Sequence, residues 1–175
     1  MTLPAGALAR MPPMVVHGFR NGSPDAEVRY LNLHAPGRGF AGYLRALRDW
    51  LPAAYDQEPP PAEGIRPAGD AVIGGAALPA DVEEIGVAEM RCEPGDPPAP
   101  PHVHERHLES LYVLEGELAV SAGAHELRAP AGSWVRLPAG VPHVVAAGGS
   151  RAARFLDVHT PSCGLGRLDQ RPAAG

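Results

Sequence analysis

The sequence contains no lysine, so its 15 basic side chains other than histidine are all arginine, against 20 acidic side chains. The formal net charge of −5 leaves no basic surface of the kind that binds nucleic acid or anionic lipid. No apolar run approaches the roughly 20 residues of a transmembrane helix. The first residues also lack the charged and apolar regions of a secretory signal. We therefore expect a cytoplasmic protein without nucleic-acid or membrane partners.

Cysteine is nearly absent as well. Cys92 and Cys163 stand far apart, without the close spacing of a metal or redox motif. Two isolated thiols are typical of a reducing compartment and not of a disulfide framework. The length of 175 residues allows one ordinary domain and part of another.

The sequence does have a histidine-rich run before a short apolar stretch. His102 and His104 are two residues apart, so in a strand their side chains leave the same face. Glu109 follows at an odd spacing, so a bend or bulge across Glu105–Leu108 is needed to return it to that face. The β-prone residues 111–114 then resume a strand that ends at Glu115-Gly116. Two imidazoles and one carboxylate are thereby predicted to converge.

A fourth donor follows a tight turn. Residues 132–143 predict a strand, a Pro/Gly turn and a second strand that opens with His143. Three imidazoles and a carboxylate suit iron, nickel, copper, zinc or manganese, and they disfavour calcium. The alternative is a polar network held by hydrogen bonds, but four ionisable groups are costly to bury unpaired. The predicted metal ligands are therefore His102, His104, Glu109 and His143.

The spacing of these residues resembles the two sequence motifs of the cupin superfamily. The first motif is matched by Gly95, His102, His104, Glu109 and Gly116, and the second by Gly132, Pro138, Gly140 and His143. The second motif often ends with an asparagine, which is Ala147 here and removes no ligand. The resemblance covers about residues 70–165 and implies an all-β cupin jelly-roll β-barrel, or double-stranded β-helix. Short strands at even spacing agree with that fold.

The first 36 residues repeat the second motif. Gly6 and His17 precede Gly132 and His143 by 126 positions, and Arg29–Pro36 parallels Arg154–Pro161. Nothing before Gly6 can supply a His-x-His pair and a glutamate, so the chain resembles a two-cupin protein that lacks the front half of its first cupin. We therefore interpret His17 as vestigial, since one imidazole falls short of a catalytic ligand set.

A further difference between the repeats lies in the turn. Met14 replaces the glycine that the later copy has at position 140, which suggests a relaxed need for a positive φ angle.

The predicted domain organisation has four parts. Residues 1–51 form a partial cupin segment with an amphipathic helix over 39–51, and residues 52–69 form a Pro-rich linker. Residues 70–165 form the complete barrel, and residues 166–175 form a flexible tail. The open strand edges of half a cupin invite pairing, so we expect a homodimer.

Three functions remain open. A five- or six-coordinate ion with four protein ligands keeps one or two positions for oxygen or a chelating substrate. The resemblance to small quercetin-dioxygenase-like cupins implies oxygen insertion into a small aromatic or enolic compound, for which Leu111, Val113 and Val145 are candidate lining residues. The alternatives are a non-catalytic metal or ligand-binding cupin (sensor, carrier or scaffold), and an isomerase or decarboxylase. His107 is an acid/base or ligand candidate, but we favour a solvated loop histidine.

Overall fold

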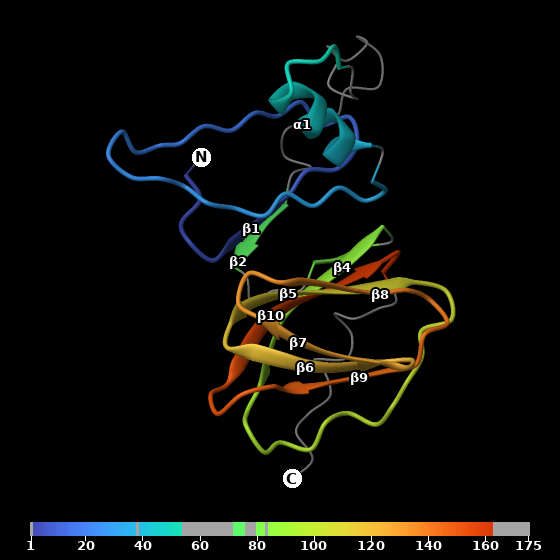
Figure 1. Ribbon diagram of the computed structural model, residues 1–175. Helices are drawn as coiled ribbons and strands as arrows, with labels where there is room; N and C mark the ends of the chain where they lie inside the picture. The colour runs from blue at the N-terminus through green and yellow to red at the C-terminus, as the bar shows by residue number, and fades with distance from the viewer. Residues whose placement is uncertain (1, 38, 54–71, 76–79, 83, 163–175) are drawn as a thin grey trace. The chain divides into compact units, whose positions relative to one another are not determined.

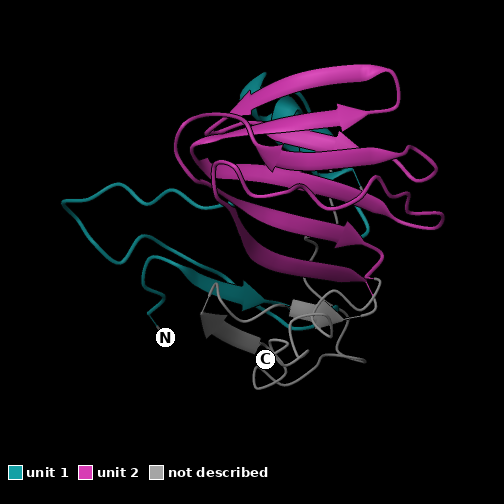
Figure 2. Cartoon of the chain, turned by 90° about the horizontal axis from the view of Figure 1, so that it is seen from below, with its two compact units in different colours: residues 1–75 teal, residues 76–175 magenta. Residues whose placement is uncertain are grey.

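The computed structural model describes residues 2–37, 39–53, 72–75, 80–82 and 84–162, and it divides the chain into two compact units. The units are Met1–Gly75 and Ala76–Gly175, coloured separately in Figure 2. Residues 54–69 of the predicted linker and the whole predicted tail lie outside the described residues. No helix in the described ranges has the length and apolar character needed to span a bilayer.

The described residues of the first unit contain two short strands and one helix. Strands β1 (Ala7–Arg10) and β2 (Val72–Gly75) pair in antiparallel register, from Ala7 opposite Gly75 to Arg10 opposite Val72. Helix α1 (Phe40–Arg48) follows Gly39, whose left-handed φ of 83° sets the turn into the helix. Arg45 and Arg48 lie in its last turn, where their positive charges interact favourably with the negative end of the helix dipole. The helix predicted over 39–51 is therefore nine residues long.

Strand β2 falls within residues 70–165, which the sequence predicted to form the complete barrel. Its partner is β1, so it belongs to the first unit and not to the sheets of the second.

The second unit consists of two antiparallel sheets that lie face to face (Figure 1). The five-stranded sheet has the order β3-β4-β10-β5-β8, and the three-stranded sheet has the order β7-β6-β9. In chain order the strands are β3 (Ala80–Val82), β4 (Ile85–Cys92), β5 (Leu108–Glu115), β6 (Glu117–Ala122), β7 (His125–Pro130), β8 (Trp134–Leu137), β9 (His143–Ala147) and β10 (Ala153–Thr160). The predicted all-β jelly roll with one short helix is confirmed.

The core of the second unit follows from alternation along the strands. Leu111 and Val113 on β5 are fully buried, while Tyr112 between them turns outward and packs on Trp134, with ring centroids 6.1 Å apart. Leu118 on β6 is also fully buried and belongs to the same apolar cluster, so both sheets contribute to it. Each such side chain contributes about 1.5–3 kcal/mol by leaving water.

The link between the sheets depends on a glycine. Gly116 connects β5 and β6 with a φ of 71°, and a Cβ atom there would collide with the carbonyl oxygen of Ala152. Only glycine meets both conditions, so this motif position is fixed by the fold and not by the chemistry of the site.

Candidate metal centre

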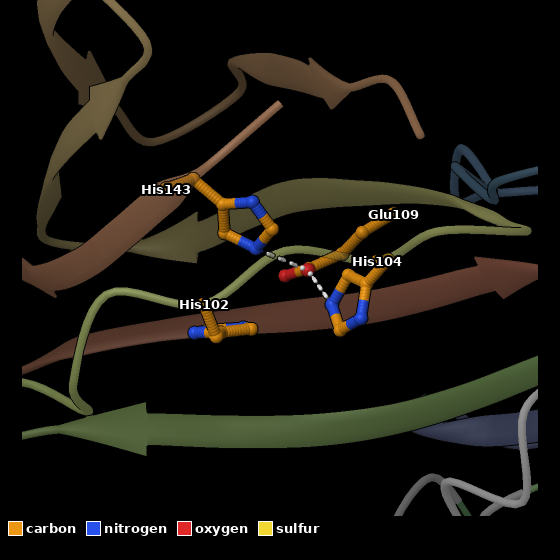
Figure 3. Close-up of side chains that lie close together, drawn as sticks. All are labelled: His102, His104, Glu109 and His143. Atoms are coloured by element: carbon orange, nitrogen blue, oxygen red, sulfur yellow. Dashed lines mark hydrogen bonds and ion pairs between the residues drawn. The ribbon is translucent and has the colours of Figure 1, made fainter. Parts of the chain in front are cut away.

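The structure brings the four predicted ligands together at one point of the second unit (Figure 3). Glu109 lies on β5, and His143 opens β9 as predicted. His102 and His104 precede β5 in an extended segment that is not a regular strand. One nitrogen or oxygen atom from each of the four side chains lies within 4.8 Å of the others.

Main-chain hydrogen bonds hold the two sequence motifs together. The His102 amide donates to the His143 carbonyl at 3.2 Å, and the His143 amide donates back at 2.9 Å. The Gly140 amide donates to the His104 carbonyl at 2.8 Å, so the Pro/Gly turn is tied to the first motif. The chain bends at Glu105 and Arg106 before β5 begins, which provides the predicted return of the carboxylate.

Hydrogen bonds to main-chain carbonyls fix which ring nitrogens carry protons. Nδ1 of His143 lies 2.9 Å from the Val141 carbonyl, and Nδ1 of His102 lies 3.1 Å from the Pro100 carbonyl. A carbonyl oxygen only accepts, so each Nδ1 donates and each Nε2 keeps a lone pair when the ring is neutral. This is how proteins orient ligating histidines.

Ring nitrogens of two histidines, His143 and His104, converge on one carboxylate oxygen. Nε2 of His143 lies 2.9 Å and Nε2 of His104 lies 2.8 Å from Oε2 of Glu109 (Figure 3). A lone pair of neutral His143 therefore faces a lone pair of Glu109, and the two acceptors repel unless a proton or another cation lies between them. The donor set thus fits a metal ion at the shared centre.

Burial makes this arrangement costly without a cation. Glu109 is 5% exposed and His143 is 2% exposed, whereas His104 is half-buried and His102 is exposed. Burial lowers the pKa of His104 from its ordinary value, and this outweighs the hydrogen bond and the charge of Glu109, which act in the opposite direction. A neutral His104 does not form a true ion pair with Glu109, despite the short distance, and so does not neutralise the buried carboxylate.

A second group of polar side chains lies beside this centre. Nδ1 of His159 lies 2.8 Å from Nε2 of His107, and Nε2 of His159 lies 3.1 Å from Oδ1 of Asp157. The solvated loop histidine favoured at position 107 is therefore wrong: His107 is half-buried, and its ring centroid lies 4.1 Å from that of His104.

Burial and the neighbouring histidines His104 and His159 lower the pKa of His107 to about 4, so it is neutral at physiological pH.

Sequence reasoning gave no role to Asp157 or His159. The alternation that places Phe155 in the core also points these two inward, and β10 sets His159 opposite Glu109 in register. Their even spacing from Phe155 along the strand was the signal in the sequence that could have identified them.

An open cavity of about 490 Å³ adjoins the centre. It is lined by Val103, His104, Glu105, Arg106, His107, Pro161 and Ser162. Of the apolar residues expected to line a substrate site, Leu111 and Val113 are instead fully buried in the core. The cavity next to His104 is therefore more polar than expected, and it includes one arginine.

His17 occupies the equivalent place in the first unit but has no comparable surroundings. Its Nδ1 lies 2.8 Å from the Val15 carbonyl, which matches the contact between His143 and Val141. Among the described residues, no group of side chains close enough to hold a metal ion includes His17.

Comparisons with known proteins give one family match and several similar structures. A family model described as a cupin domain matches residues 88–159. The TT1209 protein of Thermus thermophilus has 32% identity to this chain, with 48% of this chain and 80% of that one covered and a TM-score of 0.45. KdgF of a Halomonas species has 22% identity, with 49% and 76% covered and a TM-score of 0.45. The Cnp3 cupin domain of Schizosaccharomyces pombe has 16% identity, with 53% and 72% covered and a TM-score of 0.47. No curated protein matches the chain.

Proposed function

Since this chain belongs to the cupin superfamily, we propose that its second unit binds one divalent transition metal through His102, His104, Glu109 and His143. The observation that carries the proposal is the convergence of two imidazole nitrogens on one buried carboxylate oxygen. Three nitrogen donors and one oxygen donor suit iron, manganese, nickel, copper or zinc. A bound ion would supply a Lewis acid and a template for a chelating compound.

We further propose an oxygenase-type enzyme that acts on a small aromatic or enolic compound. The cavity beside His104 is open to solvent and large enough for a molecule of that size. Arg106 lies in its lining and would attract the oxyanion of a phenolate or enolate, which is the form that chelates metals. The role of the protein groups is then to bind and orient the substrate while Glu109 and the histidines hold the ion.

Metal analysis tests the first proposal. The protein is purified without a histidine tag, loaded with each metal and desalted, and bound metal is measured by mass spectrometry. We expect one equivalent to be lost in Glu109→Gln and in the double variant His102→Ala/His104→Ala. The matched control is His125→Ala, which removes an exposed histidine on β7 and should retain the wild-type metal content. Wild-type content in all variants would contradict the proposal.

Oxygen consumption tests the second proposal. A panel of catechols, enolic diketones and flavonols is added to the metal-loaded protein, and oxygen uptake is followed with an electrode. We expect uptake with at least one compound, and its loss in Arg106→Ala with metal content unchanged. Metal binding without uptake would instead favour the non-catalytic sensor, carrier or scaffold.

We also propose a homodimer. The sheet of the first unit has two described strands, so β1 and β2 each present an edge to which another strand can add. Light scattering between about 1 and 100 µM should give twice the chain mass, and a single monomeric species throughout would contradict the proposal.

A further inference from the structure

Three imidazoles form a second group in the same unit, and one of them also contacts the shared carboxylate. Ring nitrogens of His104, His107 and His159 lie within 4.8 Å of one another. His104 also belongs to the first centre, whereas His107 and His159 belong to neither cupin motif. Three imidazoles are the protein ligand set of many zinc sites that keep an open position for water.

The orientation of His159 is that of a metal ligand. Asp157 and His159 are two residues apart on β10 and point to the same side, with 8% and 4% exposure. Oδ1 of Asp157 lies 3.1 Å from Nε2 of His159. With the proton of the neutral ring on Nε2, beside this carboxylate, the Nδ1 lone pair is directed toward His107. A carboxylate behind the ring is the arrangement that orients ligating histidines and raises their basicity.

The remaining nitrogens are disposed to share an ion with His159. Nδ1 of His159 and Nε2 of His107 are 2.8 Å apart. In the first centre, likewise, the ligand atoms of the histidines and Glu109 lie 2.8 and 2.9 Å apart. Nε2 of His104 faces Glu109. To ligate both ions at once, the His104 ring would lose its remaining N–H proton to water in the open cavity and bridge the ions as an imidazolate.

An ion can reach this position from solvent. His104 and His107 line the open cavity, so water can both deliver the ion and complete its coordination. The buried carboxylates Asp157 and Glu109 lie close to His159 and offset the added positive charge.

We infer that His104, His107 and His159 form a second position for a divalent metal, with Asp157 as the residue that orients His159. The position takes a nitrogen-preferring ion such as zinc or cobalt, and it is coupled to the first centre through His104. It goes beyond the proposed function, which uses one ion and the four residues of the first centre.

Metal stoichiometry tests the inference. Zinc and cobalt are titrated into the tag-free, metal-free protein against a chromogenic chelator, and bound metal is counted after desalting. We expect two equivalents in the wild type and in His125→Ala, and one in each of His107→Ala and His143→Ala. His107 lies in a half-buried loop, so its removal leaves the core intact, and circular dichroism confirms the fold. Asp157→Asn should weaken the second equivalent by about 10–100-fold.

The variants separate this inference from the proposed function. A wild type that saturates at one equivalent, lost in His143→Ala but kept in His107→Ala, overturns the second position and leaves the first intact. One equivalent lost in His107→Ala but kept in His143→Ala supports the second position and overturns the first. No binding in the wild type overturns both, and so does binding that no variant changes. In that last case His159 makes only a hydrogen bond with His107 and an ion-pair contact with Asp157.

Discussion

Residues 6–36 and 132–161 repeat one sequence pattern, and their turns have the same geometry. Gly6 and Gly132 both have positive φ angles, of 79° and 87°. In both copies a valine amide donates to a proline carbonyl at 3.3 Å, from Val15 in the first and Val141 in the second. The following histidine bonds back to that valine, and both copies end with a cis proline, at Pro36 and Pro161. The local sequence is therefore sufficient for the turns.

The strands agree only before the turn, where β1 of the first copy corresponds to β8 of the later copy. The later copy contains β9 and β10, whereas residues 11–37, as far as they are described, contain no strand. Strand β9 pairs with β6, and β10 lies between β4 and β5, which gives each a partner from outside the repeat. The comparison teaches that strands need partner segments, because their hydrogen bonds are made to other parts of the chain.

One expectation about the repeat is wrong. The replacement of the turn glycine by Met14 suggested that the positive φ was no longer needed, yet Met14 has a φ of 66°, close to the 80° of Gly140. The hydrogen bond between Val15 and Pro12 closes the same turn as in the later copy and holds methionine in a conformation that it rarely adopts.

The largest difference between the copies should appear in stability. Phe155 is 5% exposed in the core, and its counterpart Tyr30 is 61% exposed. Phe155→Ala should reduce the free energy of unfolding by about 3–5 kcal/mol, because it leaves a cavity. Tyr30→Ala should change it by less than about 0.5 kcal/mol. Urea unfolding followed by circular dichroism measures both, and similar losses would mean that the two copies are packed alike.

The second-largest difference between the two copies should appear in the effect of histidine substitutions on metal affinity. His143→Ala removes a buried donor and should weaken binding by about a hundredfold or more, since even the loss of an outer partner costs about 10–100-fold. His17→Ala removes a histidine in the equivalent place without ligand neighbours and should leave affinity unchanged. Competition with a chelator gives both values. An effect of His17→Ala would show that the first copy takes part in metal binding.

Substitutions at the equivalent turn positions 14 and 140 should have smaller effects on stability, and these effects should have opposite signs. Gly140→Ala places a Cβ atom at a φ of 80° and should cost about 1–2 kcal/mol. Met14→Gly relieves the same strain and should stabilise its turn by less than about 1 kcal/mol, because glycine also gains freedom in the unfolded chain. Hydrogen exchange of the Val15 and Val141 amides reports each turn locally. Faster exchange in Met14→Gly would contradict the assignment of strain.

The smallest effect concerns two equivalent histidines in the metal-free protein. Burial and the charge of His17 lower the pKa of His34 from 6.5. Burial also acts to lower the pKa of His159, but the hydrogen bond and charge of Asp157 together with the charge of Glu109 outweigh it, so this pKa is raised from 6.5. The equivalent of Asp157 in the first copy is Asn32, which carries no charge.

The pH dependence of stability should therefore have opposite signs. The contribution of His159 is fully present below pH 6.5 and is lost as pH rises through its folded pKa, whereas that of His34 is lost as pH falls from 6.5 toward its folded pKa. Nuclear magnetic resonance titration of the two rings should show the order of the pKa values. Asp157→Asn should lower that of His159, and an unchanged titration would remove Asp157 as the cause.

The fold and the first centre could be predicted because short-range patterns encode them. The β-prone residues 111–114 predicted β5, and the odd spacing to Glu109 required the bend that the structure has at Glu105 and Arg106. The second group could not be assembled in this way, because His107 lies in a loop and meets His159 only through the pairing of β10 with β5. The lining of the cavity was also predicted wrongly. The alternation of side chains along a strand separates buried residues from exposed ones, but it does not separate residues of the core from residues that line a cavity.

The reciprocal main-chain bonds between His102 and His143 have a consequence for how such a centre can change. Peptide groups make these bonds, so any residue except proline at the two positions can form them. The side chains at these two positions can therefore be substituted, and the chemistry of the centre changed, while the backbone keeps the same arrangement.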